Sequence, residues 1–294
     1  MPIASSDGVD LYYERRGVGP RLLFLNGSGS TIEGSGLLLG VFAGPFDLVA
    51  WDYRGMGRSG IPPSPYDMSQ CARDAVAVLD AVGWDTARVL GISFGGMVAQ
   101  ELAVTAPGRI ERLALLCTSA GGEGGSSYPL HELERMSDDE RNRTRRQLID
   151  TRFDPEWLAS HPSDRDLVDA MERRTPGPAP GREQGHLLQL EARRHHDVWG
   201  RLPAITCATY VACGRFDGIA PPGNSAALAS RIAGSQLHTY EGGHAFLAQD
   251  PRSITDVIGF LQGGSGSVPP GPTGTPTGTG AWPEEAPVTG PGSG

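Results

Sequence analysis

The sequence predicts an α/β fold, a mostly parallel doubly wound sheet covered by helices on both faces. Three observations predict it. Short apolar runs alternate with longer segments of helical periodicity. Several of these runs end in glycine-rich sequence, as strands do where they enter a loop. One polar stretch, residues 121–200, interrupts the alternation with helical patterns and no convincing strand.

The apolar runs define the expected strands, which are residues 21–25, 47–51, 88–92, 113–117, 208–211 and 236–240. Two helices stand out between them. Residues 70–82 place apolar side chains on one helical face, and residues 94–105 form a helix that Pro107-Gly108 ends. Strand-to-helix order of this kind favours parallel strands with crossover helices.

Residues 121–200 are rich in Arg, Asp and Glu, and Pro and Gly interrupt their helical patterns. An insertion at the end of a strand in a doubly wound fold lies over the ligand crevice, so this stretch is a candidate cap or lid. A helical excursion on the surface is the alternative. The expected division is a core domain of residues 1–120 and 201–262 and a helical cap of residues 121–200.

The last stretch, residues 263–294, contains ten Gly and seven Pro among 32 residues and is rich in Thr. Such a segment has too little apolar surface to offset the entropy of ordering, which predicts a disordered tail. A docking segment around Trp282 is the other interpretation.

Composition excludes several function classes. All 25 basic residues of the 294-residue chain are Arg, so there is no Lys for a Schiff base, a pyridoxal phosphate or a P-loop. The net charge of -9 disfavours nucleic acid and anionic membranes as partners. With no secretory signal and no apolar run of membrane length, a cytoplasmic protein is expected. The oligomeric state is left open.

The four cysteines give no sign of a metal or dithiol site. Cys71, Cys117, Cys207 and Cys213 include no C-x-x-C pair, and the last three lie in apolar runs. A free cysteine in such a run behaves as a small buried hydrophobic residue. We therefore expect no metal and no organic cofactor.

Ser93 is the candidate nucleophile. It lies in a Gly-Ile-Ser-Phe-Gly-Gly sequence, residues 91–96, directly between an expected strand and an expected helix. A G-x-S-x-G pattern arises by chance about 0.4 times in a chain this rich in Gly and Ser, so its setting carries the argument. A sharp turn there lifts the hydroxyl above the sheet, at the positive end of a helix.

A serine needs a base and an orienting acid. His244 follows the last expected strand and is the best base, because His238 lies inside a strand and His195, with His196, lies near the end of the cap. Asp217, just past the preceding strand, is the expected acid, and Glu123 is a weaker candidate.

The expected oxyanion donors are two backbone N–H groups. One belongs to Phe94, after the nucleophile, and the other to Ser28, in the glycine-rich loop 26–30. A phosphate cradle is the alternative for this loop, but the G-x-G-x-x-G spacing is missing.

Together these motifs resemble the α/β-hydrolase-fold superfamily. The sequence W-D-Y-R-G-M-G-R-S, residues 51–59, is similar to the D-x-R-G-x-G-x-S turn of that family. Residues 91–100 and 106–110 resemble the branch of the 3-oxoadipate enol-lactonases, esterases and methylesterases. The resemblance covers residues 1 to about 262. It implies that the cap is inserted after the sixth strand, and that the order Ser93, Asp217, His244 is that of a catalytic triad.

The expected activity is hydrolysis of a small carboxylic ester or lactone through an acyl-enzyme. One departure is Asn26, where most members have His before the glycine of the oxyanion loop. This change favours, as an alternative, a cyclase, lyase or acyltransferase. A non-catalytic ligand receptor is the third hypothesis. Large residues and Asn26 are candidates for the substrate pocket: Asn26, Phe94, Met97, Trp157, Met171, Trp199 and Phe246.

Overall fold

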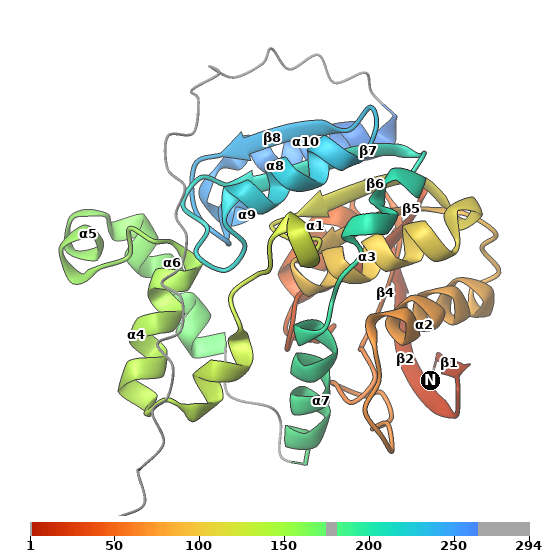
Figure 1. Ribbon diagram of the computed structural model, residues 1–294, viewed down its shortest axis with the longest axis horizontal. Coiled ribbons are helices and arrows are strands. Elements are labelled where there is room, and N and C mark those ends of the chain that lie inside the picture. The colour runs from red at the N-terminus through yellow and green to blue at the C-terminus, as the bar shows by residue number, and fades with distance from the viewer. Residues whose placement is uncertain (1, 175–180, 264–294) are drawn as a thin grey trace, which may run out of the picture.

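A computed structural model describes residues 2–174 and 181–263. Within them the chain forms one eight-stranded sheet of order β1-β2-β4-β3-β5-β6-β7-β8, flanked by helices (Figure 1). The strands are β1 (Ile3–Ser6), β2 (Val9–Arg16), β3 (Arg21–Leu25), β4 (Asp47–Trp51), β5 (Ala87–Ile92), β6 (Ile110–Leu116), β7 (Ala208–Gly214) and β8 (Gln236–Tyr240). Only the β1–β2 and β2–β4 pairs are antiparallel. The predicted doubly wound α/β fold is confirmed.

The central strands are apolar on both faces, because each face is covered. Along β3, Leu23 and Leu25 belong to one core cluster, whereas Leu22 and Phe24 belong to the cluster on the opposite face. The same alternation runs through β4 and β6, as expected for parallel strands buried on both sides. Register aligns one apolar row across four strands: Val49, Leu23, Val89 and Leu113.

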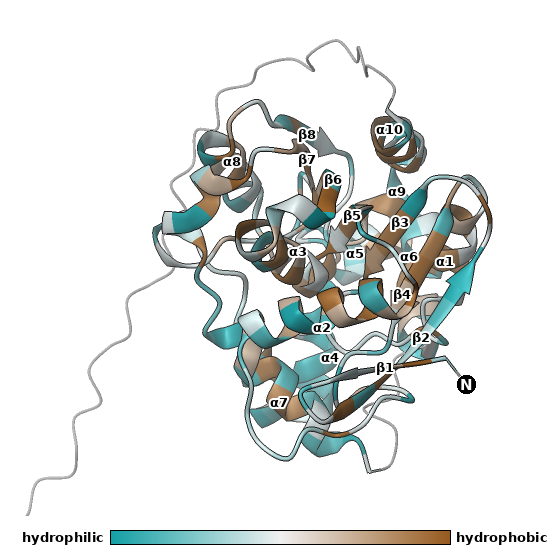
Figure 2. Ribbon diagram, turned by 90° about the vertical axis from the view of Figure 1, so that its right-hand side faces the viewer, coloured by the Kyte–Doolittle hydropathy of each residue, from teal (hydrophilic) through white to brown (hydrophobic). Residues whose placement is uncertain are grey.

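Helices cover the two faces in separate groups (Figure 2). On one face lie α2 (Met68–Ala81), α3 (Phe94–Thr105) and α8 (Pro222–Arg231), whose apolar residues join the first cluster. On the other lie α1 (Gly36–Ala43) and α10 (Pro251–Gln262), which contribute to the second. Local signals fix the helix starts: Asp67 caps α2 through the N–H of Gln70, and Asp250 caps α10 ahead of Pro251. A short turn, η1 (Pro107–Arg109), precedes β6 and another, α9 (Phe246–Gln249), precedes α10.

The chain between β6 and β7 is helical, with no strand among its described residues. It comprises η2 (Gly122–Gly124), η3 (Leu130–Arg135), α4 (Asp138–Ile149), α5 (Pro155–Ser160), α6 (Pro162–Arg174), α7 (Glu183–Arg194) and η4 (Trp199–Ala204). Helices α4, α5 and α6 gather at the side toward which β6 and β8 point (Figure 1). The insertion therefore lies at the carboxyl edge of the sheet.

Two features differ from, or lie beyond, the expectations. The N-terminal hairpin of β1 and β2 forms the antiparallel edge of the sheet and is absent from the predicted strands. The expected tail, including Trp282, lies outside the described residues except for Gly263. No helix in the described part of the chain has the length and hydropathy needed to cross a bilayer.

Candidate active site

Ser93 occupies a strained turn between β5 and α3. Its backbone has φ 55° and ψ −115°, a conformation that residues other than glycine rarely adopt. Glycines make this turn possible. A Cβ at Gly95 would lie 2.1 Å from the carbonyl oxygen of Leu25, and a Cβ at Gly91 2.4 Å from the carbonyl oxygen of Gly95. The serine is thereby held at the carboxyl edge of the sheet.

The first turn of α3 leaves donors free beside Ser93. The N–H groups of Gly96 and Met97 donate to the carbonyl oxygen of Ser93, as does the hydroxyl of Thr118 at 2.8 Å. The N–H of Phe94, in the first helical position, has no such acceptor among the described residues. It is available at the positive end of the helix dipole.

The loop after β3 passes directly beside Ser93. A Cβ at Gly27 would lie 3.7 Å from the Cβ of Ser93. The N–H of Gly29 donates to Oε1 of Gln189 at 2.7 Å, which fixes the loop to α7 of the cap. The N–H of Ser28 makes no hydrogen bond within the described residues. Ser28 and Phe94 thus both keep a free backbone donor near the serine.

The D-x-R-G-x-G-x-S turn supports this loop. The buried carboxylate of Asp52 accepts from the N–H of Ile32 at 2.7 Å and from the N–H of Arg58 at 2.9 Å. It therefore ties the loop after β3 to the turn after β4. Asn26 is 3% exposed, its carbonyl accepts from the Tyr53 hydroxyl, and its Nδ2 has no hydrogen-bond partner.

Asp217, which is buried, and His244, which is partly exposed, form a hydrogen-bonded pair. The Nδ1 atom of His244 lies 2.8 Å from Oδ2 and 3.0 Å from Oδ1 of Asp217. The N–H groups of Ile219 and Ala220 also donate to Oδ1, each at 2.8 Å. Because a carboxylate only accepts, Nδ1 carries the proton and Nε2 keeps a lone pair. Asp217 therefore selects the neutral tautomer in which Nε2 is the free nitrogen of the ring.

Cys117 links this pair to the serine turn. Its sulfur, a carboxylate oxygen of Asp217 and a ring nitrogen of His244 lie within 4.8 Å of one another. The adjacent carbonyl of Leu116 accepts from the N–H of Ser93 at 2.8 Å. Burial raises the pKa of the Cys117 thiol well above its usual value, and the charge of Asp217 raises it further. No hydrogen bond joins the Ser93 hydroxyl to His244 here, a contact that often tightens only with substrate bound.

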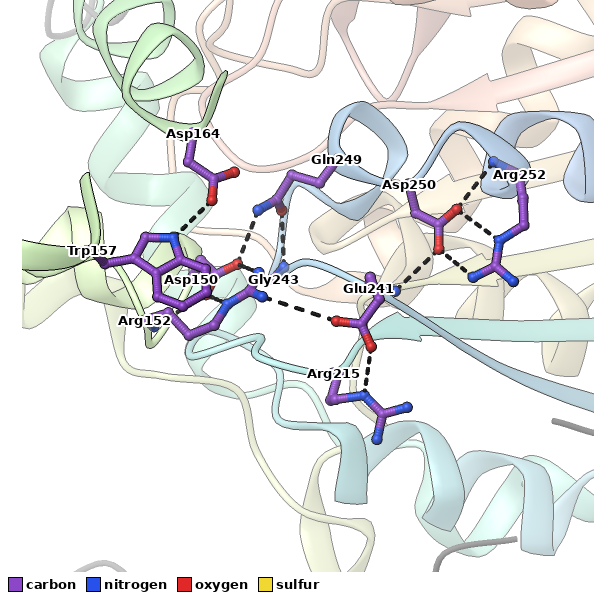
Figure 3. Close-up of polar contacts among 10 residues, drawn as sticks. All are labelled: Asp150, Arg152, Trp157, Asp164, Arg215, Glu241, Gly243, Gln249, Asp250 and Arg252. Carbon is purple, nitrogen blue, oxygen red and sulfur yellow. Dashed lines mark hydrogen bonds and ion pairs between the residues drawn. The ribbon is translucent and has the colours of Figure 1, made fainter. Parts of the chain in front are cut away.

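A polar network anchors the loop of His244 to the cap (Figure 3). Asp150 is fully buried and accepts from the guanidinium of Arg152 and, at 2.9 Å, from Nε2 of Gln249. Oε1 of Gln249 in turn accepts from the N–H of Gly243 at 2.9 Å. The side-chain amide of Gln249, next to the loop of His244, is therefore held both at its nitrogen and at its oxygen.

Backbone contacts reinforce this anchor. Three hydrogen bonds join residues 148–151 to the loops of Asp217 and His244: His244 N–H to the Ile149 carbonyl at 2.6 Å, Gly218 N–H to Leu148 at 3.1 Å and Thr151 N–H to Phe216 at 2.9 Å. The end of α4 therefore supports the loops that carry Asp217 and His244.

A cavity of about 240 Å³ lies between the core and the cap. Two arginines and two histidines line it, and no acidic residue does: Met97, Ser119, Gly121, Ser126, Ser127, Pro129, His131, Arg193, Arg194 and His196. Met97 is one helical turn after Ser93 and connects the two regions along α3, although neither Ser93 nor His244 lines the cavity itself.

Of the residues proposed for the pocket, only Met97 lines this cavity. Phe246 is fully buried in the core and stacks on Tyr240. The indole of Trp157 stacks on His161 within the cap and donates to Asp164 (Figure 3).

The other proposed positions are also engaged elsewhere. The Trp199 indole donates to Glu123, an exposed carboxylate with no contact to His244, so Glu123 is not placed as the acid. Phe94 is fully buried and contacts Tyr53 edge to face. Met171 does not line the cavity. Large apolar side chains in this chain serve packing more than substrate contact.

Sequence reasoning does not assign three polar residues to this site, and it names His196 only as a weaker candidate base than His244. Gln189, Arg193 and His196 are each at most 7% exposed, and each has a side-chain nitrogen with no hydrogen-bond partner in good geometry. No motif marks them. Their only sequence signal is a helical spacing that leaves Gln189 and Arg193 one turn apart on α7.

Comparison with known proteins agrees with this architecture. The family described as alpha/beta hydrolase fold matches residues 25–251. The chain belongs to this family.

Two curated relatives, both from bacteria, are similar to most of the chain. A protein of Azorhizobium caulinodans named as a carbamate hydrolase, RutD, is 28% identical over 264 residues, 88% of this chain and 97% of its own. The 3-oxoadipate enol-lactonase 2 of Acinetobacter baylyi is 26% identical over 242 residues, 81% of this chain and 87% of its own. Among solved structures, an enol-lactonase from Burkholderia xenovorans LB400 shares the fold with a TM-score of 0.73 at 21% identity, covering 88% of this chain and 99% of that one. The protein is a hydrolase of the α/β-hydrolase fold.

Proposed function

We propose that this protein hydrolyses a carboxylic ester or lactone of a small molecule, with Ser93 as nucleophile, His244 as base and Asp217 as orienting acid. The observation that carries the proposal is the hydrogen bond between the buried Asp217 and His244, together with a serine held at a strained strand-to-helix turn. The names of the relatives, an enol-lactonase and a carbamate hydrolase, support acyl transfer to water.

In the first half-reaction the Ser93 oxygen attacks the substrate carbonyl while its proton passes to Nε2 of His244. Asp217 keeps the imidazole in the right tautomer and stabilises the imidazolium that forms. The N–H groups of Phe94 and Ser28 hold the tetrahedral oxyanion. When the intermediate collapses, His244 returns the proton to the leaving alkoxide and the acyl group remains on Ser93.

In the second half-reaction His244 takes a proton from water, whose oxygen attacks the acyl carbonyl. A second tetrahedral oxyanion uses the same two donors. Its collapse releases the carboxylic acid, and the proton on His244 returns to the oxygen of Ser93. For a lactone, acid and alcohol leave as one hydroxy acid.

The test is intact mass after treatment with a fluorophosphonate, on wild type, Ser93→Ala and Ser225→Ala. Ser225 is a buried serine of α8 and serves as the matched control. We expect one adduct on wild type and on the control, and none on Ser93→Ala. Turnover of a reactive ester should fall at least about a thousandfold in Ser93→Ala. An adduct that persists on Ser93→Ala, or a variant that keeps over about a tenth of the rate, would remove Ser93 from this role.

Product analysis separates hydrolysis from non-hydrolytic chemistry on the same scaffold. Stoichiometric release of free acid and alcohol from a methyl ester supports hydrolysis. Transfer of the acyl group to an added alcohol or thiol, with little free acid, would favour an acyltransferase instead.

A further inference from the structure

Arg193 is a buried cation without an anionic partner. It is 5% exposed, and its Nη1 and Nη2 donate to the carbonyl oxygen of Tyr128 at 2.8 Å and to the hydroxyl of Ser127 at 2.7 Å. Its Nε has no acceptor. No carboxylate pairs with it in residues 2–174 and 181–263. Three of its five N–H donors are therefore unused.

This arrangement is energetically incomplete. Burial lowers the pKa of Arg193 to about 10, so the guanidinium still carries its charge at neutral pH. A buried ion that lacks its partner destabilises the fold, and such ions in proteins are normally paired. A ligand that supplies the anion would remove this cost each time it binds.

The surroundings of Arg193 favour an anion. None of the described residues lining the cavity is acidic, and Arg194 and His131 add basic groups to its wall, with Glu191 paired to Arg194 at 3.8 Å just outside it. The chain as a whole carries a net charge of -9, so this wall is a local exception. The guanidinium is also held in place by Ser127 and Tyr128 before any ligand arrives. A planar, fixed guanidinium matches the two oxygens of a carboxylate.

The position of Arg193 relates it to the serine. Met97 lines the same cavity, and its N–H donates to the carbonyl oxygen of Ser93. On α7, Gln189 is one turn before Arg193 and accepts from Gly29 of the oxyanion loop. Helix α7 therefore carries both a support of the acyl site and the unpaired cation, about 6 Å apart along the helix axis.

We propose that Arg193 binds a free carboxylate of the substrate, so that the enzyme acts on small esters or lactones that also carry an acid group. This inference rests on the proposed function. A cavity of about 240 Å³ holds on the order of eight water volumes, which limits the ligand to a short chain.

The experiment compares two matched substrates, monomethyl glutarate and its carboxamide analogue, methyl 4-carbamoylbutanoate. They differ only in the charge of the distal group. Shorter and longer pairs, from succinate to adipate, cover the unknown spacing. In wild type we expect kcat/KM for the best acid substrate to exceed that of its amide by roughly 10- to 100-fold. Equal values at every chain length, with both esters hydrolysed, would overturn the assignment.

Substitutions locate the effect. Arg193→Met keeps the length of the side chain but not the charge, and should bring the ratio close to one while the amide ester is still hydrolysed. Arg194→Met, next in the helix and more exposed, should lower the ratio by less than about threefold. Equal losses on both substrates in a folded Arg193→Met protein would make Arg193 a structural residue. If Arg193→Met does not fold, Arg193→Lys must lower the ratio at least about fivefold for the proposal to stand.

A binding measurement separates this inference from the proposed function. Free glutarate should raise the thermal midpoint of Ser93→Ala, and should leave Ser93→Ala/Arg193→Met unchanged. Stabilisation by glutarate without any ester hydrolysis by wild type would refute the function but keep the anion site. Hydrolysis of neutral esters without stabilisation by any dicarboxylate would refute the anion site but keep the function.

Discussion

At the scale of single residues, His196 shows how burial sets the charge of a side chain that lines the cavity. The ring lies between the core and α7, is 7% exposed and has no hydrogen-bond partner in good geometry. Burial lowers its pKa to about 4, against a smaller opposite effect of the negative charges of Glu101 and Asp197. The ring is therefore neutral at physiological pH, and it adds no charge beside Arg193.

This pKa predicts a pH-dependent stability. In the unfolded chain a histidine takes up a proton near pH 6.5, whereas the folded protein excludes that proton until about pH 4. Because the unfolded state binds more protons between these values, the free energy of unfolding falls as pH drops from about 6.5 to 4, by about 3 kcal/mol. Urea unfolding at several pH values measures it. His196→Gln should flatten the curve in this window, and an unchanged slope would contradict the assignment.

Local sequence marks some residues of the candidate site and not others, for a physical reason. Ser93, Asp217 and His244 each follow a strand in a glycine-containing turn, so local sequence marks them. Arg193 stands out only because no carboxylate pairs with it in the described structure. Whether an arginine has an ion-pair partner depends on residues distant in the sequence, so the residues next to Arg193 do not reveal it. Phe246 is the reverse case. Its size suggests that it lines a substrate pocket, but the structure buries it completely in the core.

At the scale of elements, the junction of β3, β5 and α3 depends on very short approaches. A side chain at Gly95 would meet the carbonyl of Leu25, and neither backbone can move without shifting the strand or the helix. Gly40, in α1, has open space around its Cα. The close approach of α3 to β3 therefore requires glycine at position 95, whereas no packing contact requires glycine at position 40.

Alanine at these two positions should act in opposite directions. Gly95→Ala should lower the free energy of unfolding by about 3 kcal/mol or more and impair labelling of Ser93, because the helix must move away from β3. Gly40→Ala should raise stability by up to about 1 kcal/mol, since alanine favours a helix interior. Chemical unfolding of both variants measures the difference. Similar midpoints for the two would mean that the junction is looser than described.

The strands found from sequence and the strands missed differ in composition. The parallel strands are buried on both faces and read as continuous apolar runs. In the missed hairpin, β1 has four residues, and only the small Ala4 and Ser6 are buried. β2 is polar along its second half, which extends beyond β1 and pairs with β4 alone among the described strands. Neither has an apolar run of the kind that marked the others.

At the scale of the whole molecule, hydrogen bonds join the cap to the loops that carry Asp217 and His244. Gln249 bridges Asp150 of the cap and the N–H of Gly243, beside His244 (Figure 3). Its side chain is a positioning element rather than a participant in the chemistry. The expected boundary of the cap at residues 121–200 follows the chain, but these contacts cross it.

Removing this bridge should affect turnover more than binding. In Gln249→Ala we expect kcat to fall about 10- to 100-fold with a small change in KM, because His244 loses its fixed position. Gln262→Ala, an exposed glutamine at the end of α10, is the matched control and should behave as wild type. Steady-state kinetics on one ester, with thermal unfolding of both variants, provides the comparison. A folded Gln249→Ala protein with normal kcat would show that the histidine loop holds its position without Gln249.

The segment from Leu148 to Arg152 belongs to the cap in sequence but to the catalytic scaffold in space, through its hydrogen bonds to the loops of Asp217 and His244. This has a consequence for exchanging caps between relatives to obtain new selectivities. A transplant that begins near Gly121 would replace the support of the acid and the base together with the substrate-facing helices. The better junction for a chimaeric enzyme lies after Arg152, where the chain has already left the loops that hold the chemistry.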